Sequence, residues 1–275
     1  SEQVTNDTSL VFSGTAEAGS TVAVRIDGNQ VATVVADASG SWSYDHSDTE
    51  LDDAIYSVTA IATDSAGNTS GESDSLTVVV DTAAPAPTAI TGISDDTGRS
   101  NSDALTNDTT LVLTGQATAN QRISVFVDGG FAGFVDTDPT GAWAYDYSFV
   151  SLSDGEHVFT TVASDIAGNT STESAYTVTV DTEASAAPVI SAISDDTGTP
   201  GDGITSDNTL RILGTAEAFD DVVVSMDGSV VGTVQADGNG DWVYDNRAVV
   251  LDDGSYVITA VAVDAAGNGS AVSDN

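Results

Sequence analysis

Residues 122–135, RISVFVDGGFAGFV, decide the fold of this chain. Ile123, Val125 and Val127 alternate with other residues, which is the period of a strand with one buried face. The pair Asp128-Gly129 follows at once, and Asp-Gly between two alternating apolar runs predicts a tight β-hairpin. No part of the chain shows a sustained helical period of 3.6, so the sequence predicts no helices.

The hairpin pattern occurs three times at nearly constant spacing. Its turns are Asp27-Gly28, Asp128-Gly129 and Asp227-Gly228, at offsets of 101 (128−27) and 99 (227−128). A period of about a hundred residues is the size of a domain and longer than a solenoid repeat. The 275 residues are therefore predicted to form three domains, residues 1–82, 83–182 and 183–275.

The middle unit gives the clearest reading of one domain. Strands are predicted at residues 88–93, 110–117, 122–127, 131–135, around Trp143, at 156–164 and at 175–180, with a loop at 94–108. Seven short strands in about 100 residues are typical of an immunoglobulin-like sandwich. The predicted fold class is therefore all-β, with three tandem immunoglobulin-like β-sandwich domains in an elongated array.

Aromatic residues and the two chain ends refine this reading. Tyr56 and Tyr256 are spaced as in a tyrosine corner, whereas the middle unit has His157 there. The three Trp residues are expected in the cores, with a sugar-binding platform as the alternative. The first domain is expected to lack its N-terminal strand and the third its C-terminal strand. Either a cut from a longer array or a strand donated by a neighbouring molecule would account for this.

The charge balance is extreme and limits the possible partners. Asp and Glu number 43 against five Lys plus Arg, giving a formal net charge of −38, and there is no Cys. Such a surface repels nucleic acid and anionic membrane. No apolar run approaches the roughly 20 residues that cross a bilayer. Most of the acids are Asp, whose carboxylates can converge on a hard cation such as calcium.

Several ordered motifs resemble a known family, the bacterial Ig-like (BIg) domain repeats of giant type I-secreted or biofilm-associated surface adhesins. They are VDTAAP at residues 80–85, ISDDTG at 93–98 and 193–198, GTAEA at 14–18 and 214–218, and D-x-A-G-N ending at Asn68, Asn169 and Asn268. The resemblance covers essentially the whole chain. It implies an extracellular protein of the bacterial cell surface, a stalk of such domains, calcium at or near the junctions, and no catalysis.

Recurring Asp residues are the candidate calcium ligands. In an Ig-like sandwich the loop at 94–108 and the end of the last strand lie at one end of the domain, facing the D-x-A-G-N loop of the next. Calcium takes six to eight oxygen ligands, so this junction supplies suitable donors. The alternative is that each Asp only caps its own turn. The candidate metal ligands are Asp64, Asp81, Asp95, Asp96, Asp103, Asp165, Asp181, Asp195, Asp196, Asp202 and Asp264.

The predicted function is structural. The chain would be an extender segment of a secreted surface adhesin, rigidified by Ca²⁺ at its joints, and it would support cell adhesion or biofilm formation. Its partners would be neighbouring Ig-like repeats of the same parent chain, with a host or abiotic surface bound through other regions. Two alternatives are a subunit of a polymerised surface filament completed by strand donation, and a carbohydrate- or receptor-binding module. No repeated nucleophile and His pair, phosphate-binding loop or basic patch suggests an enzyme or a nucleic-acid binder.

Overall fold

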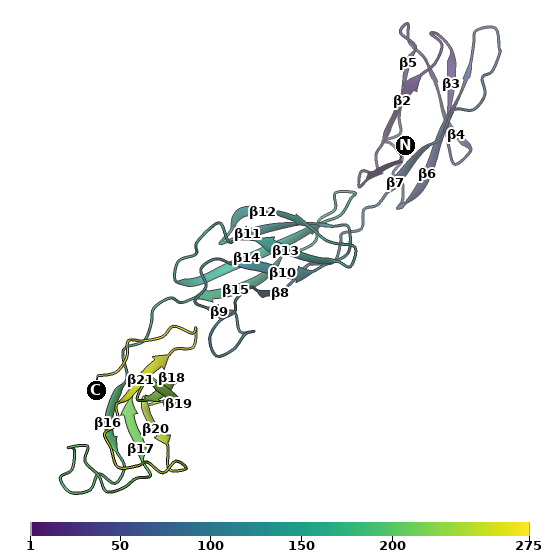
Figure 1. The fold of residues 1–275 in the computed structure, drawn as a ribbon. Coiled ribbons are helices and arrows are strands. Elements are labelled where there is room, and N and C mark those ends of the chain that lie inside the picture. The colour runs from purple at the N-terminus through teal and green to yellow at the C-terminus, as the bar shows by residue number, and fades with distance from the viewer. Residues whose placement is uncertain (1, 275) are drawn as a thin grey trace.

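The computed structural model describes residues 2–274, and these form three all-β domains arranged end to end in an elongated row (Figure 1). Every regular element in these residues is a strand. No helix among them has the length and apolar character needed to cross a bilayer. The expectation of an all-β protein without helices is confirmed.

The middle domain is a sandwich of two sheets. One sheet has the order β12-β11-β14-β15-β9 and the other β13-β10-β8. The strands are β8 (Ala89–Ile93), β9 (Leu105–Thr106), β10 (Val112–Gln116), β11 (Arg122–Val127), β12 (Gly130–Asp136), β13 (Ala142–Asp146), β14 (Gly155–Ser164) and β15 (Ser174–Val180). The predicted strands all form, with small differences at their ends.

The first domain has the same plan with one strand fewer. Its sheets have the orders β1-β7-β6-β3-β4 and β2-β5. The strand β1 runs parallel to β7, as β9 does to β15, so β1 corresponds to β9. The strands are β1 (Glu2–Thr5), β2 (Val11–Thr15), β3 (Thr21–Ile26), β4 (Asn29–Val35), β5 (Ser41–Asp45), β6 (Ala54–Thr63) and β7 (Leu76–Val80).

The third domain has two three-stranded sheets, β16-β17-β20 and β19-β18-β21. Within residues 2–274, no strand pairs with β21 on the side where β15 pairs with β14. Donation of a strand to this edge stays a prediction of the sequence. The strands are β16 (Val189–Ile193), β17 (Arg211–Thr215), β18 (Asp221–Met226), β19 (Ser229–Gln235), β20 (Asp241–Asp245) and β21 (Ile258–Val263).

One strand lies where the sequence predicts only loop. The two-residue strand β9 falls inside the predicted loop at 94–108 and pairs in parallel with Thr179 and Val180 at the end of β15. Thr106 is fully buried there, and its hydroxyl donates to the carbonyl of Asp95 at 2.7 Å. A strand this short has no periodicity of its own, and it forms because β15 offers a free edge.

The hairpin turns have the geometry that Asp-Gly predicts. Asp27, Asp128 and Asp227 have φ near +50°, and each following Gly has φ +77°, as a type I′ turn requires. Each Asp also accepts a hydrogen bond from a backbone N–H on, or just before, the neighbouring strand, for example from Val158 to Asp128 at 2.8 Å. These Asp residues are therefore structural.

The Trp residues belong to the cores. Trp143 and Trp242 are 4% and 2% exposed, and Trp42 packs against the core of the first domain. Each domain has a separate cluster of buried apolar side chains between its sheets. An exposed Trp platform for sugar is thus not formed.

All three domains have a side-chain hydrogen bond at the position of the tyrosine corner, but in the middle domain a histidine makes it. The hydroxyls of Tyr56 and Tyr256 donate to the carbonyls of Asp52 and Asp252 at 2.9 and 3.0 Å. In the middle domain, His157 Nε2 bonds the carbonyl of Ser153 at 2.8 Å, and its Nδ1 bonds Asp128 at 2.8 Å. Histidine thus replaces tyrosine and ties the corner to the hairpin turn.

Candidate functional site

Each D-x-A-G-N loop is held in shape by the carboxylate of its first residue, which accepts hydrogen bonds from later residues of the same loop. The two carboxylate oxygens of Asp264 accept bonds from the backbone N–H groups of Gly267 and Asn268 and from the Asn268 amide, all at 2.8–2.9 Å. Asp165 makes the same contacts in the middle domain. In the first domain the Asn68 side chain and backbone N–H groups lower the pKa of Asp64. The alternative prediction, that Asp caps a turn, describes these three residues.

The same loops build both joints through their Asn side chains. Asn169 Nδ2 donates to the backbone carbonyl of Asp81 at 2.8 Å, and Asn268 Nδ2 donates to that of Asp181, also at 2.8 Å. Each Asp is the first residue after the last strand of the preceding domain. One hydrogen bond of constant geometry thus fixes where the domains meet. The sequence predicts Asp81 and Asp181 as carboxylate ligands, whereas their carbonyls make this contact.

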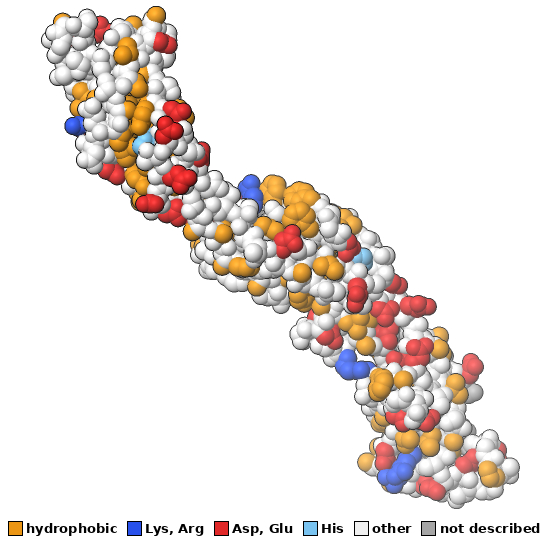
Figure 2. All heavy atoms as spheres, turned by 180° about the vertical axis from the view of Figure 1, so that it is seen from behind, with side chains coloured by type: hydrophobic (Ala, Val, Ile, Leu, Met, Phe, Trp, Pro, Cys, Tyr) orange, Lys and Arg blue, Asp and Glu red, His pale blue; other side chains and the backbone are white. Residues whose placement is uncertain are grey.

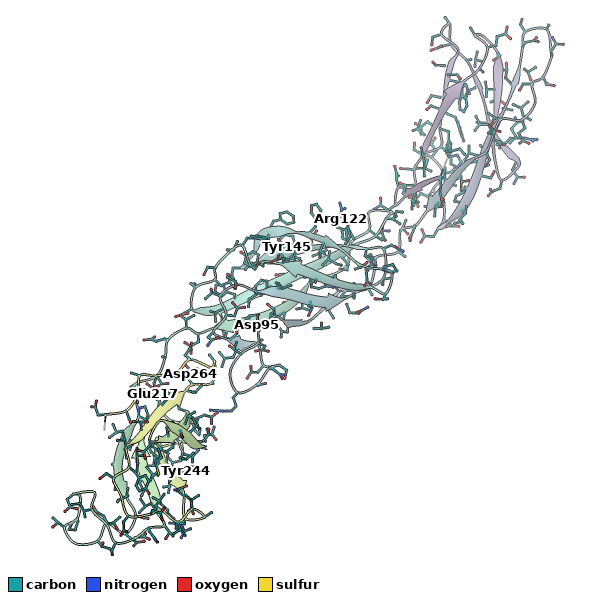
Figure 3. The ribbon with its side chains drawn as sticks, viewed as in Figure 1. Asp95, Arg122, Tyr145, Glu217, Tyr244 and Asp264 are labelled. Carbon is teal, nitrogen blue, oxygen red and sulfur yellow. The ribbon has the colours of Figure 1, made fainter. Side chains whose placement is uncertain are left out.

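The second joint has a further set of contacts, made by the loop between β8 and β9. Thr97 Oγ1 donates to the carbonyl of Ala266 at 2.7 Å, so the loop touches the D-x-A-G-N loop of the third domain. Asp95 and Asp264 lie on the two sides of this joint, with Glu217 close to it (Figure 3). Three separate segments of the chain thus meet at this joint: residues 97–99 of the loop after β8, residue 181, and the D-x-A-G-N loop at 264–268.

Within the same loop, Asp96 is the most unusual acid. Asp96 Oδ2 accepts a bond from the backbone N–H of Ala104 at 3.1 Å, while its Oδ1 is buried without a hydrogen-bond partner. Burial raises the pKa of Tyr176, and the charges of Asp96 and Asp103 raise it further, so both carboxylates lie within electrostatic range of the Tyr176 hydroxyl. An unpaired buried carboxylate oxygen is costly unless another group satisfies it.

The far end of the third domain repeats this arrangement. Asp196 Oδ1 is again buried without a partner, and its Oδ2 accepts from Gly201 N–H. Thr205 donates to the carbonyl of Asp195 at 2.7 Å, as Thr106 does to Asp95, and Asp202 caps Ile204 N–H at 3.0 Å. These three Asp residues lie away from both joints, as the strand order predicts.

The predicted carboxylates do not form one compact ligand set. Among residues 2–274, no three side chains of Asp, Glu, His or Cys are grouped as a metal site requires. Asp64, Asp165 and Asp264 instead bond within their own loops, and Asp81 and Asp181 meet the neighbouring domain through their backbone carbonyls. The feature that could accept a hard cation is smaller: the unpaired oxygen of Asp96, in the same loop as Asp103.

Sequence reasoning missed four residues of the second joint, namely Arg99, Phe219, Asp220 and Asp221. Arg99 forms an ion pair with Asp221 at 3.1 Å, and it donates to the carbonyl of Phe219. Burial raises the pKa of the nearby Asp220; the charges of Glu217 and Asp264 act in the same direction, and Arg99 opposes them. The signal was available: Arg99 is one of only five basic residues in the chain, in an otherwise acidic loop.

The middle domain also exposes two aromatic side chains on its edge strand β12. Phe131 and Phe134 on the edge strand β12 are 63% and 56% exposed, and Phe126 packs edge-on against Phe131. The guanidinium of Arg122 lies 4.4 Å from the Phe134 ring centroid. Figure 2 shows hydrophobic side chains beside a basic one on the middle domain. With the 101-residue offset, the first domain has Gln30 and Thr33 at the positions of the two exposed Phe residues.

The chain belongs to the bacterial Ig-like domain family, whose sequence model matches residues 1–82, 83–182 and 184–274. A search among curated proteins gives no match.

A comparison with solved structures finds matches of low sequence identity. The fibronectin(III)-like modules of Clostridium thermocellum CbhA are 17% identical, with a TM-score of 0.42 over 66% of this chain and 88% of theirs. The BSP domain of a biofilm associated protein is 13% identical, with a TM-score of 0.25 over 97% of this chain and 62% of its own. The human OSCAR ligand-binding domain is 14% identical, with a TM-score of 0.32 over 70% and 98%.

Proposed function

We propose that these domains are a stalk segment of a secreted bacterial surface adhesin, which holds an adhesive region away from the cell. The observation that carries the proposal is the repeated joint, in which the Asn of each D-x-A-G-N loop bonds the carbonyl following the previous domain's last strand, at 2.8 Å both times. A joint that repeats with the domain suits an extender of many copies. Family membership supports the same role, which involves no catalysis.

The stalk role predicts an extended particle in solution. The longest strands, β6 and β14, have 10 residues each and span about 33 Å. Three such domains in a row should give a maximum dimension of about 100 Å or more by small-angle X-ray scattering. A compact particle in which the domains fold back on one another would contradict the stalk.

Calcium is the finer part of the proposal. Two observations support calcium binding. The loop at 94–103 contains the unpaired oxygen of Asp96 and the carboxylate of Asp103, and the net charge of −38 on the chain makes the domains repel one another unless a cation lies between them. A cation bound there would satisfy that oxygen and stiffen the loop that docks on the third domain. Binding only to the ordered loop would stabilise it by about 2.7 kcal/mol at a free concentration roughly a hundred times Kd.

Removing calcium with a chelator is expected to raise the flexibility of the second joint and to lower the melting temperature. Asp96→Asn should abolish this response of the joint, measured by scattering with and without calcium. Asp196→Asn is the matched control, because its oxygen is equally unpaired but lies at no joint of these three domains. Each substitution should remove the binding at its own loop, and only that binding, in calorimetric titration. Identical scattering of the unaltered chain in calcium and in chelator would disprove the calcium switch.

One observation favours a second function, ligand binding by the exposed Phe face of the middle domain. Rings that are 63% and 56% exposed lose apolar hydration when covered, so they suit contact with an apolar or ring-shaped ligand surface. Phe131→Gln with Phe134→Thr installs the residues of the first domain at these positions. If the face binds, glycan-array or receptor signals seen with the unaltered chain should fall to background. Signals that survive the double substitution would remove this candidate.

A further inference from the structure

The second joint contains a docking surface that is separate from its Asn–carbonyl hydrogen bond. It is made by Thr97, Gly98 and Arg99, at the tip of the loop between β8 and β9. Besides the Thr97 contact with Ala266, the Arg99 backbone N–H donates to the carbonyl of Ala265 at 3.3 Å. The loop thus lies along the D-x-A-G-N loop of the third domain over consecutive residues.

Glycines make this close approach possible. Gly98 has φ +86°, and a Cβ built on it would lie 2.0 Å from the carbonyl oxygen of Ala265. A Cβ on Gly267, across the joint, would lie 2.9 Å from the nitrogen of Gly98. The two backbones touch with no space for a side chain, so the contact is specific in shape.

Arg99 adds a contact specific in charge. Its Nε pairs with Asp221 Oδ2 at 3.1 Å, and its Nη2 donates to the carbonyl of Phe219. It therefore reaches the start of β18 and the turn before it, more than a hundred residues away in sequence. Its positive charge also lies near Asp220, where it lowers the pKa of that carboxyl, whereas the negative charges of Glu217 and Asp264 raise it. The Arg99 guanidinium thus gives an otherwise acidic joint a positive charge that belongs to the protein itself.

The partner position of Arg99 differs in every domain. With the offsets of 99 and 101, the residue corresponding to Asp221 is Arg122 in the middle domain and Thr21 in the first. Arg122 already pairs with Asp136 in its own domain at 2.8 Å. A loop carrying Arg would meet like charge on a domain of the middle type, and opposite charge only on a domain of the third type. The third domain itself carries Thr199 where the middle one has Arg99.

We propose that the tip at residues 97–99 is a selective docking element, in which Arg99 restrains the angle of the second joint independently of any bound ion and docks best on a following domain that has an acid at the position of Asp221. The inference deepens the proposed stalk function and rests on it for its biological meaning. Each joint of the stalk then has its own stiffness, set by the residue pair at these two positions.

Spin-label distance measurements on the full chain test this inference. The chain has no Cys, so labels can be placed uniquely at Ala144→Cys and Val243→Cys, two exposed positions that correspond to each other in β13 and β20. A second pair, Ser43→Cys with Ala144→Cys, reports on the first joint and serves as the internal control. All measurements are made in chelator, so that the result does not depend on calcium.

In chelator, the unaltered chain should give a distance distribution between the labels at 144 and 243 that is wider than in calcium but narrower than that of the Arg99 variants. Arg99→Ala should broaden it, and Arg99→Asp or Asp221→Arg should broaden it more, because like charges then face each other. Combining Arg99→Asp with Asp221→Arg should restore the distribution of the unaltered chain. None of these changes should alter the first joint.

Two results would overturn the inference: an unchanged distribution in Arg99→Ala, or a charge swap that restores nothing. Failure of the stalk function would look different, since a compact scattering profile would then appear even in the unaltered chain. Failure of the calcium proposal would likewise appear as insensitivity to chelator, with the Arg99 effects intact.

Discussion

Gly98→Ala is expected to open the second joint while leaving all three domains folded. The new Cβ would lie 2.0 Å from the carbonyl oxygen of Ala265, which is backbone and cannot rotate away. Forcing a methyl group into a packed contact costs about 1–3 kcal/mol. Since the joint is a small interface, a penalty of about 2 kcal/mol would shift its docked-to-open ratio up to roughly 30-fold. A broadened distance distribution between labels at positions 144 and 243 would report the opening.

The third domain provides the control for backbone strain. Gly198 occupies the corresponding loop position with φ +87°, but a Cβ there meets nothing within 4 Å. Gly198→Ala therefore carries the same cost of a left-handed conformation, about 1–2 kcal/mol, without the clash. It should leave the distance distribution unchanged. An equal effect of the two substitutions would show that loop strain, rather than contact across the joint, controls the angle.

The repeat and the sandwich could be predicted because their signals are local. Alternating apolar residues and the Asp-Gly pairs at 27, 128 and 227 act within one hairpin, and the structure places strands where the sequence predicts them. The strand β9 could not be predicted in this way. Its two residues form a strand only because the edge of β15, about 70 residues later, is free to pair with them.

The joint could be predicted in location but not in chemistry. Strand order alone brings residues 94–103, 181 and 264–268 together, as the structure shows. The abundance of Asp suggests carboxylate ligands, yet the spacing of Asp264 and Asn268 already allows the Asn amide to bond the carboxylate of its own loop. Such local bonds compete with any cation for the same oxygens. The number of acidic residues in a sequence does not show how many of their oxygens are already hydrogen-bonded within their own loops.

Arg99 shows a second limit of sequence reasoning. Its partners, Asp221 and the carbonyl of Phe219, belong to another domain and have no fixed spacing from it. The position corresponding to Asp221 also differs among the three domains, so comparing the repeats hides the pairing. The contacts that distinguish one joint from another are made by residues that differ between the repeats. Only the structure shows which of these residues lie opposite each other across a joint.

Gly115→Ala is expected to destabilise the middle domain by about 3 kcal/mol. A Cβ on Gly115 would lie 2.1 Å from Trp143 Cζ2 and 2.4 Å from the carbonyl oxygen of Ala89 on β8. The Trp143 ring is 4% exposed and donates from Nε1 to Thr88 at 3.0 Å, so it could move only by breaking that bond. The figure of about 3 kcal/mol is the sum of an overpacking cost of about 1–3 kcal/mol and the loss of a buried hydrogen bond, about 1 kcal/mol. For a domain of about 100 residues the melting temperature should fall by roughly 15 °C.

Two other glycines turn this prediction into a graded test. On the adjacent strand, a Cβ on Gly92 would have its nearest neighbour, Thr114 Oγ1, at 3.9 Å, so Gly92→Ala should be nearly neutral. In the first domain, a Cβ on Gly14 would meet the Trp42 ring at 2.6 Å and no backbone atom among its nearest neighbours, so Gly14→Ala should cost less than Gly115→Ala. Calorimetry of the full chain should resolve which transition moves. If Gly115→Ala costs no more than Gly92→Ala, the Trp ring does not require glycine opposite it, and the presence of glycine at positions 14, 115 and 214, each facing a Trp ring, needs another explanation.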